Sequence, residues 1–280
     1  MKKINRRSFL AAAGLTAAAL ALTACGGSSS STASSVASSA AASSEAASSS
    51  AAAAELTTVE AGKLTMATNA AFPPYEMTTD AGDFEGIDIE TAQAIADKLG
   101  LELQIDDMDF DAALLSVQQG KADIVMAGVT VTDERKAVMD FSDSYATGIQ
   151  SIIVPEGSDI ASPDDLAGKK IGTQRGTTGY IYCSDDFGDE NVVAYDDGLT
   201  AVQALNNGQV DAVVIDNAPA KEFIAANPGL VILETSYAEE DYAIGLAKGS
   251  SLEDAINSAL EELKADGTLQ SIVDKYISAE

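Results

Sequence analysis

Short apolar runs alternate with amphipathic segments from about residue 56 to the C-terminus. In residues 88–100 (DIETAQAIADKLG), apolar side chains recur at helical spacing and Gly100 follows the last of them, which predicts a helix ending there. Further segments of this first half predict strands at KLTMAT (63–68), LELQID (101–106) and ADIVMAG (122–128), and a helix at FDAALLSVQQG (110–120).

The second half of the chain repeats this alternation. Its segments predict strands at KKIGTQ (169–174), NVVAY (191–195) and VDAVVID (210–216), and a helix at GLTAVQALNNG (198–208). Strands that alternate with helices are typical of α/β proteins with mostly parallel sheets. We therefore expect an α/β fold.

Two segments, VQQGKADIVMAG and LNNGQVDAVVID, share the order helix, glycine, strand, with an aspartate at the same place (Asp123 and Asp211). The match suggests two lobes with the same architecture, although any helix–turn–strand unit could produce a similar pattern. In open parallel sheets, ligands bind beyond the carboxyl ends of strands. One strand end leads to Arg135 and the other to Asp216, so a cation and an anion would suit a zwitterionic ligand.

The N-terminus has the layout of a secretory signal: a basic start, an apolar stretch and small residues before Cys25. The apolar stretch is short for a membrane span. LTAC resembles a bacterial lipoprotein cleavage box, which predicts a signal peptide at residues 1–24 and a lipidated Cys25. An ordinary secretory signal with an incidental cysteine remains an alternative. Export by the twin-arginine route is also possible, because NRRSFL resembles its motif.

Residues 26–54 are almost entirely Ser, Ala and Gly. They hold too little apolar bulk to offset the entropy of ordering, and the dense serines disfavour an alanine-driven helix. We expect Cys25 and the segment to residue 55 to form a flexible tether that holds a soluble domain near a membrane.

The charge balance excludes some functions. The formal net charge is −28, and removal of residues 1–24, with four basic residues and no acid, takes it to −32. Such a protein repels nucleic acid. The chain has no histidine, which excludes Ser-His-Asp and Cys-His catalysis and disfavours a zinc site, so we expect neither a metal nor a cofactor. With Cys25 lipidated, Cys183 is the one cysteine left and no internal disulfide forms.

Six segments in order resemble the family 3 extracellular solute-binding proteins, the polar amino-acid-binding proteins of bacterial ABC importers. They are MATNAAFPPYEM, EGIDIETAQAIADKLG, FDAALLSVQQGKADIVMAGVTVTDERKAVMDFSDSY, LAGKKIGTQRGTTG, NGQVDAVVIDNAPA and YAIGLAKGSSLEDAINSALEELKADGTLQSIVDKYI. The resemblance implies a two-lobed flytrap fold, with one lobe at 56–147 plus 239–280, the other at 148–238, and crossing strands near 145–154 and 235–245. It also implies a monomer that binds a free L-amino acid outside the cytoplasm and delivers it to a permease with its ATPase.

The resemblance implies roles for particular residues. Arg135 would clamp the ligand α-carboxylate, because its planar fork makes two parallel hydrogen bonds where lysine cannot. Gly128 and Thr130 would contact the ligand from the same strand end, and Thr178 would meet the carboxylate as the lobes close. Asp216 would hold the α-ammonium. Phe72 and Phe110 would sandwich the ligand side chain, unless they are plain core. Arg175 is expected to be a surface residue of its loop.

Asn69 stands where relatives that take strongly cationic side chains often carry an aspartate, and its amide has no charge. A neutral polar ligand such as glutamine or cystine is therefore expected, unless Glu76, Asp83 or Asp107 supplies an anion. Two other functions stay open: an amino-acid sensor that reports to a signalling partner, and a cyclohexadienyl-type dehydratase using Asp or Glu as its acid or base. We expect a binding protein, not an enzyme.

Overall fold

The computed structural model describes residues 56–277, and the predicted signal peptide, Cys25 and the tether lie outside the described residues. Twelve strands lie within that range. They are β1 (Lys63–Thr68), β2 (Ala71–Phe72), β3 (Glu76–Thr78), β4 (Phe84–Glu85), β5 (Glu102–Asp107), β6 (Ile124–Val125), β7 (Met139–Pro155), β8 (Ile171–Gln174), β9 (Val192–Tyr195), β10 (Ala212–Asp216), β11 (Leu230–Ile232) and β12 (Ala238–Ala247).

Helices connect most of these strands. They are α1 (Ile87–Leu99), α2 (Phe110–Gln118), α3 (Asp133–Lys136), α4 (Thr178–Phe187), α5 (Gly198–Asn206), α6 (Asn217–Ala226), α7 (Glu253–Ala265) and α8 (Thr268–Tyr276). Short 3-10 helices lie at Pro163–Leu166 and Asp189–Asn191. Helix α1 ends before Gly100, as predicted, and Gly100 takes the left-handed conformation (φ 69°) common at helix ends.

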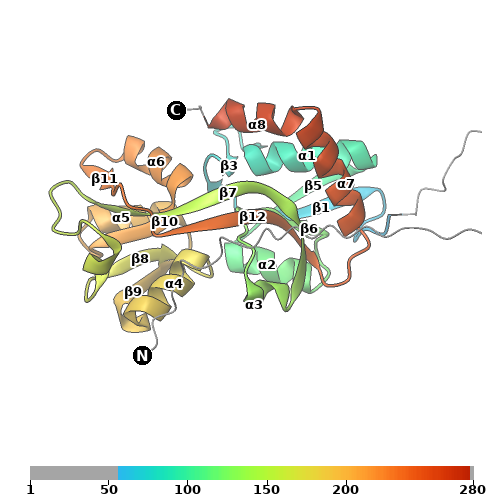
Figure 1. Cartoon of the computed structure of the whole chain (residues 1–280). Coiled ribbons are helices and arrows are strands. Elements are labelled where there is room, and N and C mark those ends of the chain that lie inside the picture. Colours follow the sequence, from blue (N-terminus) through green and yellow to red (C-terminus); the bar gives the residue numbers. More distant parts are fainter. Residues whose placement is uncertain (1–55, 278–280) are drawn as a thin grey trace, which may run out of the picture. The chain divides into compact units, whose positions relative to one another are not determined.

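One sheet runs through residues 56–277, with the strand order β5-β1-β6-β12-β7-β10-β8-β9 and with β11 beside β7. Strands β5, β1 and β6 are parallel to one another, as are β10, β8 and β9. We call the part built on the first group the first lobe and the part built on the second group the second lobe. Between them lies the antiparallel pair β7–β12, whose register extends from Ala247 opposite Met139 to Ala238 opposite Gln150 (Figure 1).

Each lobe buries apolar side chains on both faces of its part of the sheet. In the first lobe, α1, α7 and α8 cover one core and α2 covers the other. In the second lobe, α5 and α6 cover one core, and Cys183 of α4 lies in the other. The two-lobed α/β fold is therefore confirmed. The lobe boundaries at residues 147/148 and 238/239 stay a prediction, because β7 and β12 run through these points without a break.

The predicted strands and helices agree with the structure, mostly to within two residues at each end. The expected strand at 122–128 is shorter, since only Ile124 and Val125 make ladder pairs. The crossing strands lie where they were expected, although β7 begins six residues earlier, at Met139. The sequence reasoning missed the small sheet β2-β3-β4, whose strands of two or three residues are too short to show a period.

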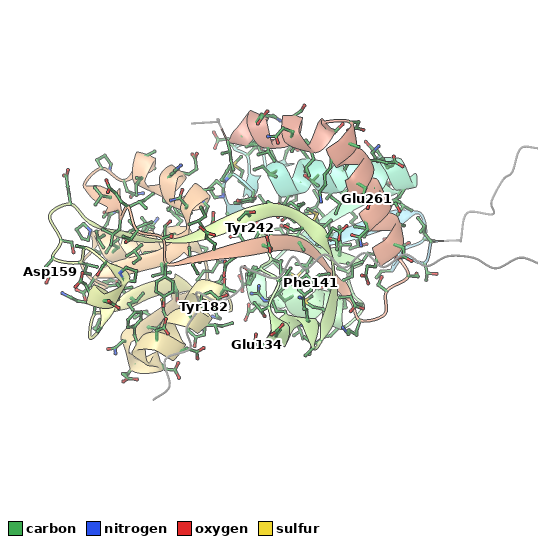
Figure 2. The ribbon with its side chains drawn as sticks, viewed as in Figure 1. Glu134, Phe141, Asp159, Tyr182, Tyr242 and Glu261 are labelled. Carbon is green, nitrogen blue, oxygen red and sulfur yellow. The ribbon has the colours of Figure 1, made fainter. Side chains whose placement is uncertain are left out.

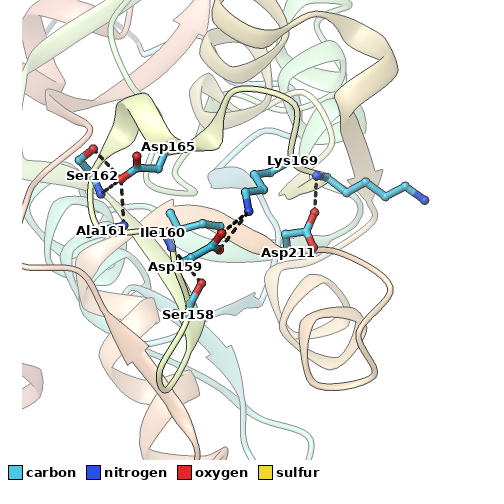
Figure 3. A network of polar contacts seen from close by, with 9 residues as sticks. Ser158, Asp159, Ile160, Ala161, Ser162, Asp165, Lys169 and Asp211 are labelled. Carbon is cyan, nitrogen blue, oxygen red and sulfur yellow. Dashed lines mark hydrogen bonds and ion pairs between the residues drawn. The ribbon is translucent and has the colours of Figure 1, made fainter.

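The aspartates of the repeated segment do the same work in both lobes. Asp123 accepts hydrogen bonds from the backbone N–H of Thr65 (2.8 Å) and Val59 (2.7 Å). Asp211 accepts one from the backbone N–H of Lys170 (2.8 Å), just before β8 (Figure 3). In each lobe, the carboxylate before one strand thus fixes the start of the neighbouring parallel strand.

We expect Asp123→Ala to lower the free energy of unfolding by about 2–4 kcal/mol, because it leaves two backbone N–H groups without their charged acceptor. Asp211→Ala is the matched control. Its carboxylate is exposed and holds one N–H, so the loss should be less than half as large. Urea unfolding of both variants measures the difference, and equal losses would contradict the assignment.

Candidate ligand-binding site

A narrow cavity lies between the lobes. All eight residues that the sequence analysis proposed as ligand contacts line it: Asn69, Phe72, Phe110, Gly128, Thr130, Arg135, Thr178 and Asp216. The cavity meets the carboxyl ends of β1, β8 and β10, as expected for open parallel sheets. Gln150 and Tyr242 line it from the crossing strands β7 and β12. Figure 2 shows Tyr242 on β12, midway between the lobes.

Arg135 lies in the short helix α3, which begins because the Thr132 side chain accepts a hydrogen bond from the Arg135 backbone N–H (3.2 Å). The residue is 8% exposed, and its guanidinium carbon lies 5.4 Å from the centre of the Phe110 ring. Nη1 donates to the Thr130 carbonyl (2.8 Å) and Nη2 to the Gly176 carbonyl of the second lobe (3.2 Å). These bonds use two of the five guanidinium N–H groups, so the fork retains donors for an anion.

Gly128 and Thr130 form the wall beside Arg135. Gly128 has a φ of 54°, and a Cβ at this position would lie 2.9 Å from Cε1 of Phe72. Any side chain here would therefore be strained and would collide with the ring. The Thr130 hydroxyl donates to Oε2 of Glu240 (3.0 Å) and lies 3.4 Å from the hydroxyl of Thr178.

Thr178 and Asp216 bring the second lobe to the cavity. Thr178 is the first residue of α4, a ten-residue helix whose N-terminal end favours negative charge. Asp216 ends β10 and begins α6, accepting from the backbone N–H of Ala218 (2.9 Å) and of Ile149 (2.7 Å). Burial raises the pKa of Asp216 to about 6, although both of these bonds oppose the shift.

The lobes touch directly at the other end of the cavity. The Asn69 side chain donates to the Met108 carbonyl (2.9 Å) and accepts from Nε2 of Gln174 (2.8 Å) in the second lobe. Together with the Arg135–Gly176 and Thr130–Thr178 contacts, this bond marks a closed arrangement of the lobes. Both ends of the Asn69 amide are thus engaged with protein groups in this arrangement.

Among the three acids that would offset a neutral Asn69, the structure places Glu76 in the cavity lining. Asp83 and Asp107 are exposed, and Asp107 accepts from the backbone N–H of Ala70 (2.8 Å). The sequence reasoning missed Gln150, Gln174, Thr177 and Tyr242 as lining residues. Gln174 ends the predicted strand 169–174, so the rule that ligands lie at carboxyl strand ends would have found it. Arg175 is exposed as expected and pairs with Asp196 (3.4 Å).

Within residues 56–277, no group of three or more Cys, Asp or Glu side chains is arranged to hold a metal ion. Nor does this part of the chain contain a helix that is both long and apolar enough to cross a bilayer.

The model of the bacterial extracellular solute-binding proteins, family 3, matches residues 64–279. The chain belongs to this family. Family membership agrees with the flytrap architecture and with a binding cavity between the lobes. Among its relatives is the L-cystine-binding protein TcyJ of Escherichia coli (strain K12), 33% identical over 226 residues, which are 79% of this chain and 85% of the relative.

Solved structures of this family have the same fold. An ancestral arginine-binding protein bound to glutamine is 42% identical, with a TM-score of 0.74, covering 78% of this chain and 99% of that one. The arginine-, lysine-, histidine-binding protein ArtJ from Geobacillus stearothermophilus is 34% identical, with a TM-score of 0.75, covering 78% of this chain and 96% of that one.

The buried carboxyl of Asp216 gives the family 3 chain an unusual pH dependence of stability. A folded-state pKa raised to about 6 means that the folded protein holds its proton more tightly than the unfolded chain. The resulting stabilisation is present in acid and is lost as the pH rises through about 6. We expect the ligand-free protein to gain about 1 kcal/mol of unfolding free energy from this group between about pH 7 and about pH 5.

Asp216→Asn should remove this gain while its amide oxygen still accepts from Ala218. Asp211→Asn, which neutralises an exposed carboxylate, is the control and should leave the gain in place. Urea unfolding of the three proteins at both pH values makes the comparison. An Asp216→Asn protein with the wild-type pH dependence would refute the role of this group.

Proposed function

We propose that this chain binds one free L-amino acid between its lobes and delivers it to an ABC permease and its ATPase. One observation carries the proposal: Arg135 and Asp216, a guanidinium and a carboxyl that are 8% and 1% exposed, line the same interlobe cavity from opposite lobes. Every free amino acid carries an α-carboxylate and an α-ammonium, so a buried cation and anion complement it. The family, and the relatives that bind cystine or arginine by their names, support this proposal.

In the proposed complex, the ligand α-carboxylate binds the guanidinium fork of Arg135 and the N-terminal end of α4 at Thr178. The ligand α-ammonium binds the carboxyl of Asp216 and lies near Thr130. Such charge-assisted bonds are strong in a site from which water is excluded. Because the ligand contacts both lobes only when they are closed, binding shifts the population towards closure, and the permease then distinguishes the closed form.

We propose a neutral polar ligand, such as glutamine or cystine, as the first choice. The support is that the uncharged amide of Asn69 and the rings of Phe72 and Phe110 line the same cavity. Burying a guanidinium or ammonium against such groups is costly unless an ionised acid of the cavity pairs with it. The relatives include both kinds of protein, one named for cystine and one named for arginine, lysine and histidine, so the family alone leaves the choice open.

A thermal-shift screen against the twenty common amino acids and cystine tests the function. A ligand that binds the folded protein alone adds about 4 kcal/mol of apparent stability at a concentration 1,000 times its Kd. We expect a clear rise in the melting temperature with a small set of polar amino acids. No rise with any of them would reject amino-acid binding.

Arg135→Ala should weaken binding of the ligand found in the screen by about 2–5 kcal/mol, the usual penalty for removing one member of a buried charge pair. This is roughly a 30- to 4,000-fold loss of affinity. Arg135→Lys should recover only part of it, because an ammonium lacks the planar fork. Calorimetry gives the affinities, with the exposed Arg175→Ala as control, for which we expect less than about a threefold change. If both arginines mattered equally, the carboxylate site would be elsewhere.

We also propose that the chain is exported and held on the outer face of the cell membrane by a lipid on Cys25. The sequence LTAC and the Ser/Ala-rich residues 26–54 support this. Cys25→Ala should move the protein from the membrane fraction to the soluble fraction, because the lipid is its anchor. The variant should keep its melting temperature, since residues 56–277 are untouched. Membrane retention of Cys25→Ala at the wild-type level would overturn the anchor.

A further inference from the structure

Glu76 is a buried acid at the edge of the proposed ligand cavity. It begins β3 of the small sheet, is 0% exposed and lines the cavity. Neither of its carboxyl oxygens accepts a hydrogen bond from an N–H or O–H donor of residues 56–277. A buried carboxyl without donors is costly in its ionised form.

Asp88 of α1 is its neighbour and is also 0% exposed. Oδ2 of Asp88 accepts from the backbone N–H of Gly128 (3.0 Å) and from the Tyr145 hydroxyl (2.8 Å), and a protonated Glu76 carboxyl hydrogen-bonds to Asp88. Asp88 therefore has the support that an anion needs, and Glu76 does not. Two adjacent buried carboxyls avoid holding two negative charges by sharing one proton.

The groups around Glu76 also favour a proton on Glu76 and a negative charge on Asp88. Acids on three different elements, Asp88 on α1, Asp107 on β5 and Asp216 on β10, disfavour a negative charge on Glu76. A negative charge on Glu76 would also act on the phenols of Tyr75 and Tyr145 and raise their pKa values. Burial, then the charge of Asp88, holds the pKa of Glu76 well above its usual range. Burial raises the pKa of Asp88 to about 6, opposed by the bonds from Gly128, Tyr145 and Glu76.

We propose that Glu76 is a specificity-determining residue whose proton selects between neutral and cationic ligand side chains. With its proton, Glu76 is an uncharged hydrogen-bonding partner for a neutral polar side chain. Without it, the same carboxylate is the counter-ion for a guanidinium or an ammonium. Binding of a cationic ligand is therefore coupled to release of the Glu76 proton to solvent. This inference rests on the proposed function.

The coupling gives the two ligand classes different responses to pH. Below the pKa of Glu76, affinity for a cationic ligand should increase by up to about tenfold for each unit that the pH rises, because one proton leaves for each ligand bound. Affinity for a neutral ligand lacks this coupling. The ratio of the two affinities is the direct readout, since pH effects on the shared α-carboxylate and α-ammonium contacts cancel in it.

Calorimetry with arginine and glutamine in two buffers of different ionisation enthalpy counts the protons. Across about pH 6 to about pH 8, we expect arginine to release up to about one proton more than glutamine. Glu76→Gln should abolish this excess and the pH dependence of the affinity ratio, because glutamine has the shape of the protonated acid and no proton to lose. Asp83→Asn makes the same acid-to-amide substitution at an exposed site and should behave as wild type.

Equal proton release for arginine and glutamine would overturn the inference. So would a Glu76→Gln protein that retains the excess, or glutamine binding with no arginine binding across that pH range. Circular dichroism of Glu76→Gln confirms that it is folded before the comparison. If neither these two nor any other amino acid binds the wild-type protein, the proposed function itself fails, an outcome separate from a bound ligand without differential proton release.

Discussion

The antiparallel pairing of β7 with β12 is the constraint on which the structure of residues 56–277 depends. The pair joins the parallel strands of the first lobe to those of the second. Its register shifts between Tyr242 and Gly245, so the ladder is irregular near its middle, where Tyr242 lines the cavity. Since both strands belong to both lobes, a rotation of one lobe must bend or twist this ribbon, and the cavity opens or closes as a result.

The cavity combines one buried cation with several buried acids. Arg135 satisfies part of its guanidinium with carbonyl groups of both lobes, whereas Asp216 depends on two backbone N–H groups. The unfavourable burial of these groups is maintained by packing elsewhere, in the four apolar cores. A zwitterion placed between Arg135 and Asp216 would supply each of them with the opposite charge. The arrangement is electrostatically incomplete by itself, as expected for a binding site.

Much of the fold and of the site follows from the sequence, for physical reasons. The alternating pattern determines the α/β class, and the rule for strand ends directs Gly128, Arg135 and Asp216 towards one site. Contacts between lobes could not be predicted in this way. That Gln174 meets Asn69, or that Arg135 reaches the Gly176 carbonyl, depends on how far the lobes close, which no local period encodes. Tyr242 was missed because a tyrosine in a strand looks like ordinary core. Asn69 lines the cavity as expected, yet its amide bonds to Met108 and Gln174, contacts that the pattern did not reveal.

Strand β7 contacts the acids of both lobes within six residues: Tyr145 bonds to Asp88, the backbone N–H of Ile149 to Asp216, and Gln150 to Glu240 (3.0 Å). Tyr145 and Ile149, which do not line the cavity, therefore help to set the geometry of the acids that do or that support its wall. The ligand affinity of such a protein can therefore change through substitutions in β7 alone, while every side chain that contacts the ligand is retained. Comparisons of binding-site residues between orthologues would then understate how much their affinities differ.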